Sequence, residues 1–283
     1  MQRAYIAKDP NFNHIWFPPT VNVGLFFNLK HNVTGMLPVR QAFAYGVDRA
    51  AVARVGEGGQ QRAANQSGIV LPTYAGWYDT SAKGKFDHDA GKAKQALSGA
   101  GYSTSHPLSL TAITITGYTD WDASLAEIKQ ELKPLGINLT VNDLAQTTYN
   151  DKLYKGDFDV AYGSETGGPA PYYELRQLLY GPNSAPLGQN ASTNYERYIN
   201  SSTDALFDQY AAADVATQHD IIKKIQQVML NVIPMVPTTE SVDWFQYNTK
   251  SVTGWPTPDD PYAQPAAYNI PDWGYVAARL QSK

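Results

Sequence analysis

The sequence predicts an α/β protein with a mixed, largely parallel sheet flanked by helices. Residues 108–116 alternate apolar and polar side chains and are rich in β-branched types, which is typical of a strand, and residues 137–141 repeat the pattern. The apolar side chains that recur at helical spacing between them are Leu125, Ile128, Leu132 and Leu135. A strand, a helix and a second strand with short links form a right-handed crossover, which places both strands parallel in one sheet.

The segment before this unit predicts a helix. Val39, Phe43 and Val47 recur at four-residue spacing, and Pro38 stands at a position suited to the first turn. We expect one helix over 39–55 that serves as scaffold.

The segments after the crossover continue the α/β pattern. A short helix that ends at Gly156 leads to a compact strand at 158–162. Residues 221–232 carry the apolar stripe of a helix, and the prolines that follow predict its end before a strand at 241–247. The Pro-rich segment 256–271 is expected to run extended along a surface.

Composition excludes several functional classes. The chain has 283 residues, of which 43% are hydrophobic, and a net charge of −4. This balance gives no electrostatic basis for binding nucleic acid, so no nucleic-acid partner is expected. Cysteine is absent, which excludes disulfides, thiolate metal sites and cysteine nucleophiles. We find no apolar run long enough to span a bilayer.

Motifs for catalysis, metals and cofactors were sought and not found. The histidines, none of which pairs with another at metal-ligand spacing, are His14, His31, His88, His106 and His219. The sequence has no nucleophile elbow, dinucleotide fingerprint or phosphate loop. We therefore expect no metal, no cofactor and no catalysis. A carbohydrate-active enzyme stays open as an alternative, because the carboxyl pair of a glycosidase is close only in space.

Five blocks of sequence carry a family resemblance. In chain order they are residues 24–49, 86–102, 132–137, 152–159 and 233–237. Together they resemble the C-terminal lobe of the extracytoplasmic solute-binding proteins of ABC importers, in family 5, whose members carry oligopeptides, nickel and oligosaccharides. The resemblance implies one lobe of a two-lobed periplasmic-binding-protein-like fold that closes over its solute by hinge motion.

The resemblance also implies a division of the chain. Residues 1–23 would be an inter-lobe crossover segment, 24–237 the C-terminal ligand-binding lobe, and 238–283 a return strand and Pro-rich tail toward a missing N-terminal lobe. The implied partners are a small-molecule solute, that N-terminal lobe and the ABC permease subunits. The implied location is extracytoplasmic, either periplasmic or as a cell-surface lipoprotein, with the leader absent from this chain.

Aromatic residues suggest the kind of solute. A sugar ring presents a flat patch of C–H groups edged by hydroxyls, so a sugar site combines aromatic faces with carboxylates and amides. The chain is 12% aromatic, and Trp121, which we place between a strand and a helix that Asp120 caps, has the position where ligands bind open α/β sheets. The candidate solute contacts are Trp121, Asp122, Glu165, Trp244, Trp77 and Asn28.

Two further stretches resemble the subgroup that binds cello- and xylo-oligosaccharides. They are residues 243–263 and residues 66–72, which Trp77 closely follows. Peptide-binding members place an aspartate in the loop after the strand that matches 158–162. That loop has no aspartate here, and Glu165 would replace it only if its geometry allowed. We therefore expect an oligosaccharide, with an oligopeptide as the alternative within the family. An interaction module without a solute of its own is a further rival.

Overall fold

The computed structural model describes residues 2–71, 73–265 and 270–283. The chain forms two compact units, one made of its two ends up to Thr20 and from Ser241, and one that spans Val21–Glu240. The structure divides the chain between Thr20 and Val21 and between Glu240 and Ser241, whereas the sequence predicts the boundaries at 23–24 and 237–238. The roles it assigns to the three segments stay predictions.

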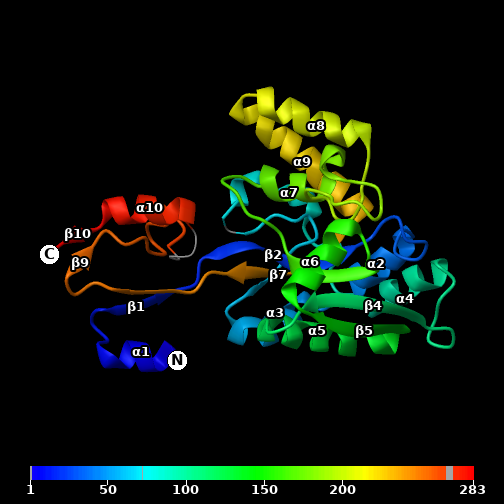
Figure 1. The fold of residues 1–283 in the computed structure, drawn as a ribbon, viewed down its shortest axis with the longest axis horizontal. Helices are drawn as coiled ribbons and strands as arrows, with labels where there is room; N and C mark the ends of the chain where they lie inside the picture. Colours follow the sequence, from blue (N-terminus) through cyan, green and yellow to red (C-terminus); the bar gives the residue numbers. More distant parts are fainter. Residues whose placement is uncertain (1, 72, 266–269) are drawn as a thin grey trace. The chain divides into compact units, whose positions relative to one another are not determined.

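The larger unit is built on a six-stranded sheet in the order β3-β7-β2-β6-β4-β5 (Figure 1). The strands are β2 (Pro19–Phe27), β3 (Arg62–Ala63), β4 (Leu108–Ile115), β5 (Ile137–Leu144), β6 (Val160–Ser164) and β7 (Met235–Val242). Strand β4 pairs parallel with β5 and β6, whereas β2 pairs antiparallel with β6 and β3 antiparallel with β7. The mixed, largely parallel sheet that the sequence predicts is confirmed.

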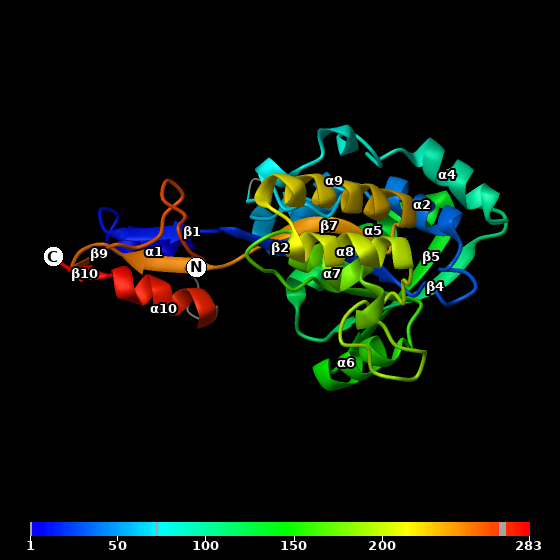
Figure 2. The same cartoon turned by 90° about the horizontal axis from the view of Figure 1, so that it is seen from above.

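Helices cover both faces of this sheet. They are α2 (Leu37–Gly46), α3 (Arg49–Val55), α4 (Ala90–Gly99), α5 (Thr119–Leu132), α6 (Gln146–Lys155), α7 (Tyr172–Leu179), α8 (Ser201–Ala212) and α9 (Val215–Val232). Tyr162 of β6 contacts Trp121 of α5, whereas a side chain at the next residue, Gly163, would meet Tyr149 of α6. Successive strand residues point to opposite faces, so α5 and α6 lie on opposite sides of the sheet. In Figures 1 and 2, α7, α8 and α9 lie together.

The predicted strand, helix and strand unit is confirmed as β4, α5 and β5. The helix buries the stripe of Leu125, Ile128 and Leu132 against the sheet. It is extended by a 3₁₀ turn over Lys133–Leu135 and stopped by Gly136, whose φ of 100° is a left-handed conformation that glycine adopts at little cost. Strand β5 then returns parallel to β4.

The single helix expected over 39–55 is wrong, because the chain forms α2 and α3 there. Val47 and Asp48 take extended conformations between the two helices. The Asp48 side chain accepts hydrogen bonds from the backbone N–H groups of Ala50 and Ala51, which caps a new helix. The sequence did not predict this break, because the four-residue spacing of apolar residues continues up to Val47, directly before the cap.

The strand expected at 241–247 is also displaced. Strand β7 begins at Met235 and a separate strand, β8 (Phe245–Asn248), follows it. Pro237 lies inside β7, where it lacks an N–H for the sheet. Its carbonyl accepts a hydrogen bond from Arg49 Nε at 2.7 Å, and strand β3 pairs only with the later residues Thr239 and Glu240.

The smaller unit contains α1 (Gln2–Lys8), β1 (Asn13–Trp16), β8, β9 (Val252–Thr253), α10 (Ile270–Arg279) and β10 (Gln281–Ser282). Strands β1 and β8 pair antiparallel, as do β9 and β10. Part of the expected extended segment 256–271 lies outside the described residues. No helix in the described part of the chain has the length and apolar character needed to cross a membrane.

Candidate functional site

The functional side chains are best located from one edge of the larger sheet. Strands β4, β5 and β6 all end at this edge, which we call the carboxyl edge. Strand β2 runs opposite to β6, so its first residues lie at the same edge, where Val23 pairs with Ser164. In open α/β sheets, the carboxyl ends of the parallel strands are where ligands bind.

Three glutamates are buried at the carboxyl edge, and they come from β6, α7 and β7. Glu165 follows β6 directly and its Oε2 accepts a hydrogen bond of 2.9 Å from Asn22 Nδ2. Glu240 Oε1 accepts one of 2.6 Å from the backbone N–H of Leu71. Neither carboxyl oxygen of Glu174 has a hydrogen-bond partner among the described residues, although the side chain is fully buried. We call Glu165, Glu174 and Glu240 the glutamate cluster.

Burial governs the charge of the glutamate cluster. Loss of water raises the pKa of Glu174 well above its ordinary value, and the neighbouring Glu165 and Glu240 raise it further. Burial likewise raises the pKa of Glu165, and it raises the pKa of Glu240 to about 7. Around neutral pH Glu165 and Glu174 therefore hold protons, whereas Glu240 is near its midpoint, and a protonated carboxyl group can donate as well as accept hydrogen bonds.

The amino end of α5 also lies at this edge. Trp121 is inside the first turn of the helix, and Tyr118, rather than the expected Asp120, occupies the N-cap position. The Trp121 side chain is only 8% exposed and its ring lies 4.6 Å from that of Tyr118. Asp122 is exposed, and partial desolvation followed by the charges of Asp143 and Asp120 raises its pKa.

Trp77 lies in a 3₁₀ turn, Ala75–Trp77, and belongs to a series of neighbouring aromatic rings that connects this turn with α7, α8 and α9. Its ring stacks on His219 of α9 at 3.8 Å and lies 6.4 Å from Tyr210 of α8. Tyr210 stacks on Tyr172 of α7 at 4.3 Å, which contacts the exposed Tyr173 edge-on. Of these rings, the sequence singled out Trp77. It missed Tyr210 and His219, because residues this distant in sequence become neighbours only when α8 and α9 pack.

Asn28 is placed elsewhere in the larger unit, and Trp244 is not part of that unit. Asn28 lies at the other end of β2, opposite the carboxyl edge, where it is buried and its Nδ2 donates to the carbonyl of Gly156 at 2.8 Å. Trp244 belongs to the smaller unit, where it is 47% exposed and meets Phe17 edge-on at 5.5 Å. Within the larger unit, Trp121 and Asp122 therefore share one edge with the glutamate cluster, which includes Glu165. Asn28 lies at the other edge.

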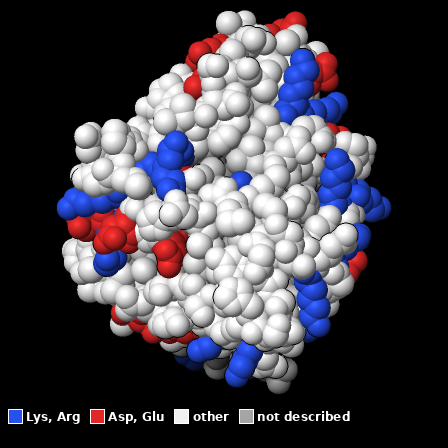
Figure 3. Space-filling model, turned by 90° about the vertical axis from the view of Figure 1, so that its right-hand side faces the viewer, with Lys and Arg blue, Asp and Glu red and all other residues white. Residues whose placement is uncertain are grey.

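The described residues show neither one continuous basic surface on the face in Figure 3 nor a group of side chains suited to a metal ion. On the face shown in Figure 3, Lys and Arg lie in separate groups around a broad area without charged side chains. Among residues 2–71, 73–265 and 270–283, no group of three or more His, Asp or Glu side chains is arranged to hold a metal ion.

Comparison with known proteins places the chain in a family. The chain is 27% identical over 217 residues to the probable D,D-dipeptide-binding periplasmic protein DdpA of Escherichia coli (strain K12), a match that covers 75% of this chain and 39% of that protein. A periplasmic oligopeptide-binding protein of an oligopeptide ABC transporter from Thermotoga maritima superposes with a TM-score of 0.84 at 24% identity, over 95% of this chain and 54% of that one. A mannohexaose-bound structure of that protein gives a TM-score of 0.80 at 24% identity, over 95% and 53% of the two chains.

The chain thus spans about two fifths to half the length of these relatives. Residues 1–186 match the family description "Bacterial extracellular solute-binding proteins, family 5 Middle". The chain belongs to the family 5 bacterial extracellular solute-binding proteins.

Proposed function

We propose that this chain is the C-terminal lobe of the solute-binding component of an ABC importer, and that it binds an oligosaccharide at the carboxyl edge. In this proposal a second, N-terminal lobe closes over the solute, ABC permease subunits receive it outside the cytoplasm, and no bond in the solute is made or broken. Family membership and a sheet edge where the rings of Tyr118 and Trp121 lie with carboxyl groups support it.

The single observation that favours a sugar over a peptide is the environment of Glu165. A peptide ammonium needs an ionised carboxylate as its partner. Glu165 is only 4% exposed, its Oε2 already accepts a hydrogen bond from Asn22, and burial raises its pKa. A carboxyl group that retains its proton suits sugar hydroxyls, which both donate and accept hydrogen bonds.

The proposed contacts divide into stacking and hydrogen-bonding groups. Trp77 would stack on a sugar ring, and the exposed carboxylate of Asp122 would accept hydrogen bonds from hydroxyls. Trp121 and Glu165 would shape the floor of the site, whereas Trp244, which belongs to the smaller unit, is not assigned a contact. Asn28 is left out, because its side chain holds the loop at the other edge. The mannohexaose bound to the Thermotoga maritima relative supports an oligosaccharide as the class of solute.

Calorimetric titration tests the proposal. The chain would be assayed alone and joined to the N-terminal lobe from its parent reading frame, against cello-, xylo- and manno-oligosaccharides and a set of short peptides. We expect saturable binding of a sugar by the two-lobed protein, and much weaker binding by the chain alone, because half of the contacts are missing.

The Glu165→Gln variant separates the two classes of solute. If a sugar hydroxyl meets this position, glutamine preserves the hydrogen bond and affinity changes by less than about threefold, whereas loss of an ion pair with a peptide ammonium would weaken binding by more than about tenfold. Binding of peptides but not sugars by the two-lobed protein would contradict the sugar proposal. Release of shortened sugar products would favour the carbohydrate-active enzyme instead.

A further inference from the structure

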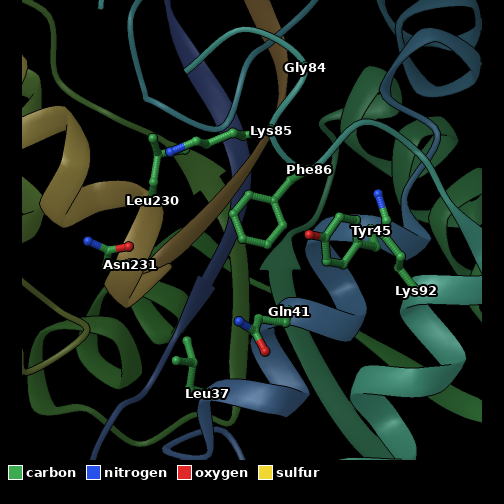
Figure 4. A pocket seen from close by; sticks show the side chains of 9 residues that line it. All are labelled: Leu37, Gln41, Tyr45, Gly84, Lys85, Phe86, Lys92, Leu230 and Asn231. Atoms are coloured by element: carbon green, nitrogen blue, oxygen red, sulfur yellow. The ribbon is translucent and has the colours of Figure 1, made fainter. Parts of the chain in front are cut away.

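The larger unit contains a cavity away from the carboxyl edge. It has a volume of about 450 Å³, within the range of small-molecule sites (Figure 4). Its lining comes from α2, the loop before α4, the first turn of α4 and the last turn of α9, and comprises Leu37, Gln41, Tyr45, Gly84, Lys85, Phe86, Lys92, Leu230 and Asn231. Helix α2 follows the end of β2, and α9 ends just before β7 begins. The cavity therefore opens beside the end of the sheet opposite the carboxyl edge.

The wall of this cavity offers hydrogen-bonding groups that the protein itself does not use. In the part of the chain that the structure describes, the side-chain amides of Gln41 and Asn231 make no hydrogen bond, nor does the hydroxyl of Tyr45. In Figure 4 the Gln41 amide lies on the side of α2 that faces the ring of Phe86, and the Asn231 amide lies farther away, at the last turn of α9. These groups are placed to receive the polar atoms of a ligand.

The charged groups of the lining are positive. Lys85 and Lys92 contribute ammonium groups and no Asp or Glu is among the lining residues. Lys92 has Asp89 at 3.6 Å and lies over the Tyr45 ring, whereas Lys85 makes only a long contact of 3.5 Å with Gln227 Oε1. Among the described residues no carboxylate forms an ion pair with Lys85, so it is the more available cation for an anionic ligand.

Phe86 is held in the cavity wall in a costly conformation. Its φ of 61° is left-handed, which is a rare state for a bulky residue and persists only where the surroundings impose it. The imposing group is the buried Arg49, whose Nη1 donates to the Phe86 carbonyl at 2.9 Å while its Nη2 donates to Gln66 at 2.6 Å. The Phe86 ring is thereby fixed at 4.7 Å from the Tyr45 ring. A pre-positioned pair of rings suits a flat, apolar ligand body.

We propose that this cavity binds a small organic anion with a flat, aromatic body, such as an arylcarboxylate. The ring of the ligand would pack against Phe86 and Tyr45, its anionic group would pair with Lys85, and the amides of Gln41 and Asn231 would complete the polar contacts. The proposal does not depend on the solute proposed for the carboxyl edge, because the two sites share no residue.

Nuclear magnetic resonance of the full, ¹⁵N-labelled chain tests this site with benzoate as the probe. We expect saturable shifts of the side-chain amide signals of Gln41 and Asn231. Benzamidine has the same shape and the opposite charge, and should leave these signals in place. Lys85→Glu should weaken benzoate binding at least about tenfold, because attraction is replaced by repulsion. Lys94→Glu makes the same charge change on an exposed residue of α4 outside the lining and should change binding less than about twofold.

Three outcomes would overturn the proposal: no saturable shift with benzoate, equal shifts with benzamidine, or equal losses in the Lys85→Glu and Lys94→Glu variants. The amide spectrum of each variant reports directly whether it is folded. Gln41→Leu provides a second test, since it removes one polar contact at a half-buried position of α2 and should weaken benzoate binding while Lys85 is unchanged.

Discussion

At the scale of single residues, the glutamate cluster is the most consequential feature of the larger unit. Oε1 of Glu165, both carboxyl oxygens of Glu174 and Oε2 of Glu240 are buried without a hydrogen-bond partner in the described residues. Buried acceptors without donors are costly, and the cost falls when a carboxyl group takes up a proton and becomes a donor. The cluster thus links the stability of the lobe to pH.

The sign of this linkage follows from the raised pKa values. Below about pH 4 a glutamate is protonated in both the folded and the unfolded chain, so these groups do not oppose folding. As the pH rises, the unfolded chain ionises first, and each such group lowers the free energy of unfolding by about 1.4 kcal/mol per pH unit until its folded pKa is reached. For Glu240, whose folded pKa is about 7, this loss ends near neutrality, whereas it continues to higher pH for Glu174.

Replacing Glu174 with glutamine should remove one of these groups. We expect Glu174→Gln to unfold at higher urea concentration than the parent chain at about pH 8, and the difference to vanish near about pH 4. Asp220→Asn on α9 makes the same change of a carboxyl group to an amide at a side chain that is 73% exposed, and as the control it should shift the midpoint far less. Equal denaturation midpoints for the parent and Glu174→Gln at both pH values would show that Glu174 does not titrate as described.

At the scale of elements, the spacing of apolar residues predicted helices and strands correctly where all local signals agree. It gave wrong element boundaries where one residue, such as a helix cap or a proline, decides them. The β4, α5 and β5 unit was predictable because its apolar spacing, its glycine stop and its alternating strands agree. The break between α2 and α3 was missed, since the side chain of Asp48 caps α3 while the apolar stripe runs on. Strand β7 was predicted to begin too late because Pro237 disfavours a strand, yet Pro237 lies inside β7, where β3 pairs only with the later residues Thr239 and Glu240.

Strand direction explains the misplaced site residue. Asn28 follows the strand Pro19–Phe27, and residues that follow a strand are reasonable ligand contacts. Because β2 runs antiparallel to β6, its end lies beside Asp159 at the start of β6, away from the carboxyl edge. Sequence alone does not give the direction of one strand relative to a distant one, so this residue could not have been assigned correctly by pattern.

The close approach of β2 and β7 gives a testable prediction at this scale. A Cβ atom on Gly24 would lie 2.2 Å from the carbonyl oxygen of Val236 and 2.9 Å from Cα of Pro237, both backbone atoms that cannot rotate away. Gly24→Ala should therefore lower the free energy of unfolding by at least about 2 kcal/mol in urea denaturation. Gly99→Ala is the control, since its Cβ would meet only Pro38 at 4.0 Å. Similar stabilities of the two variants would contradict the predicted clash.

At the scale of the whole molecule, the hydrophobic core and the candidate contacts are distributed unequally. Every buried side chain of the main apolar core, from Val23 to Val236, belongs to the larger unit. Trp77, Trp121, Asp122 and Glu165 belong to it as well, whereas Trp244 belongs to the smaller unit. Sequence patterns identified these residues by type, but which unit supports each one depends on contacts between segments far apart in the chain.

This distribution predicts that the larger unit folds without the chain ends. The segment 21–240 contains the whole main core and all six strands in large part, so burial of its apolar surface does not require residues 1–20 or 241–283. Expressed alone, it should unfold cooperatively, and the ¹H–¹⁵N signals of core residues such as Phe43, Ile128 and Ile225 should keep their positions from the full chain. A collapsed spectrum, or a broad transition where the full chain unfolds sharply, would show that the chain ends are needed to form this core.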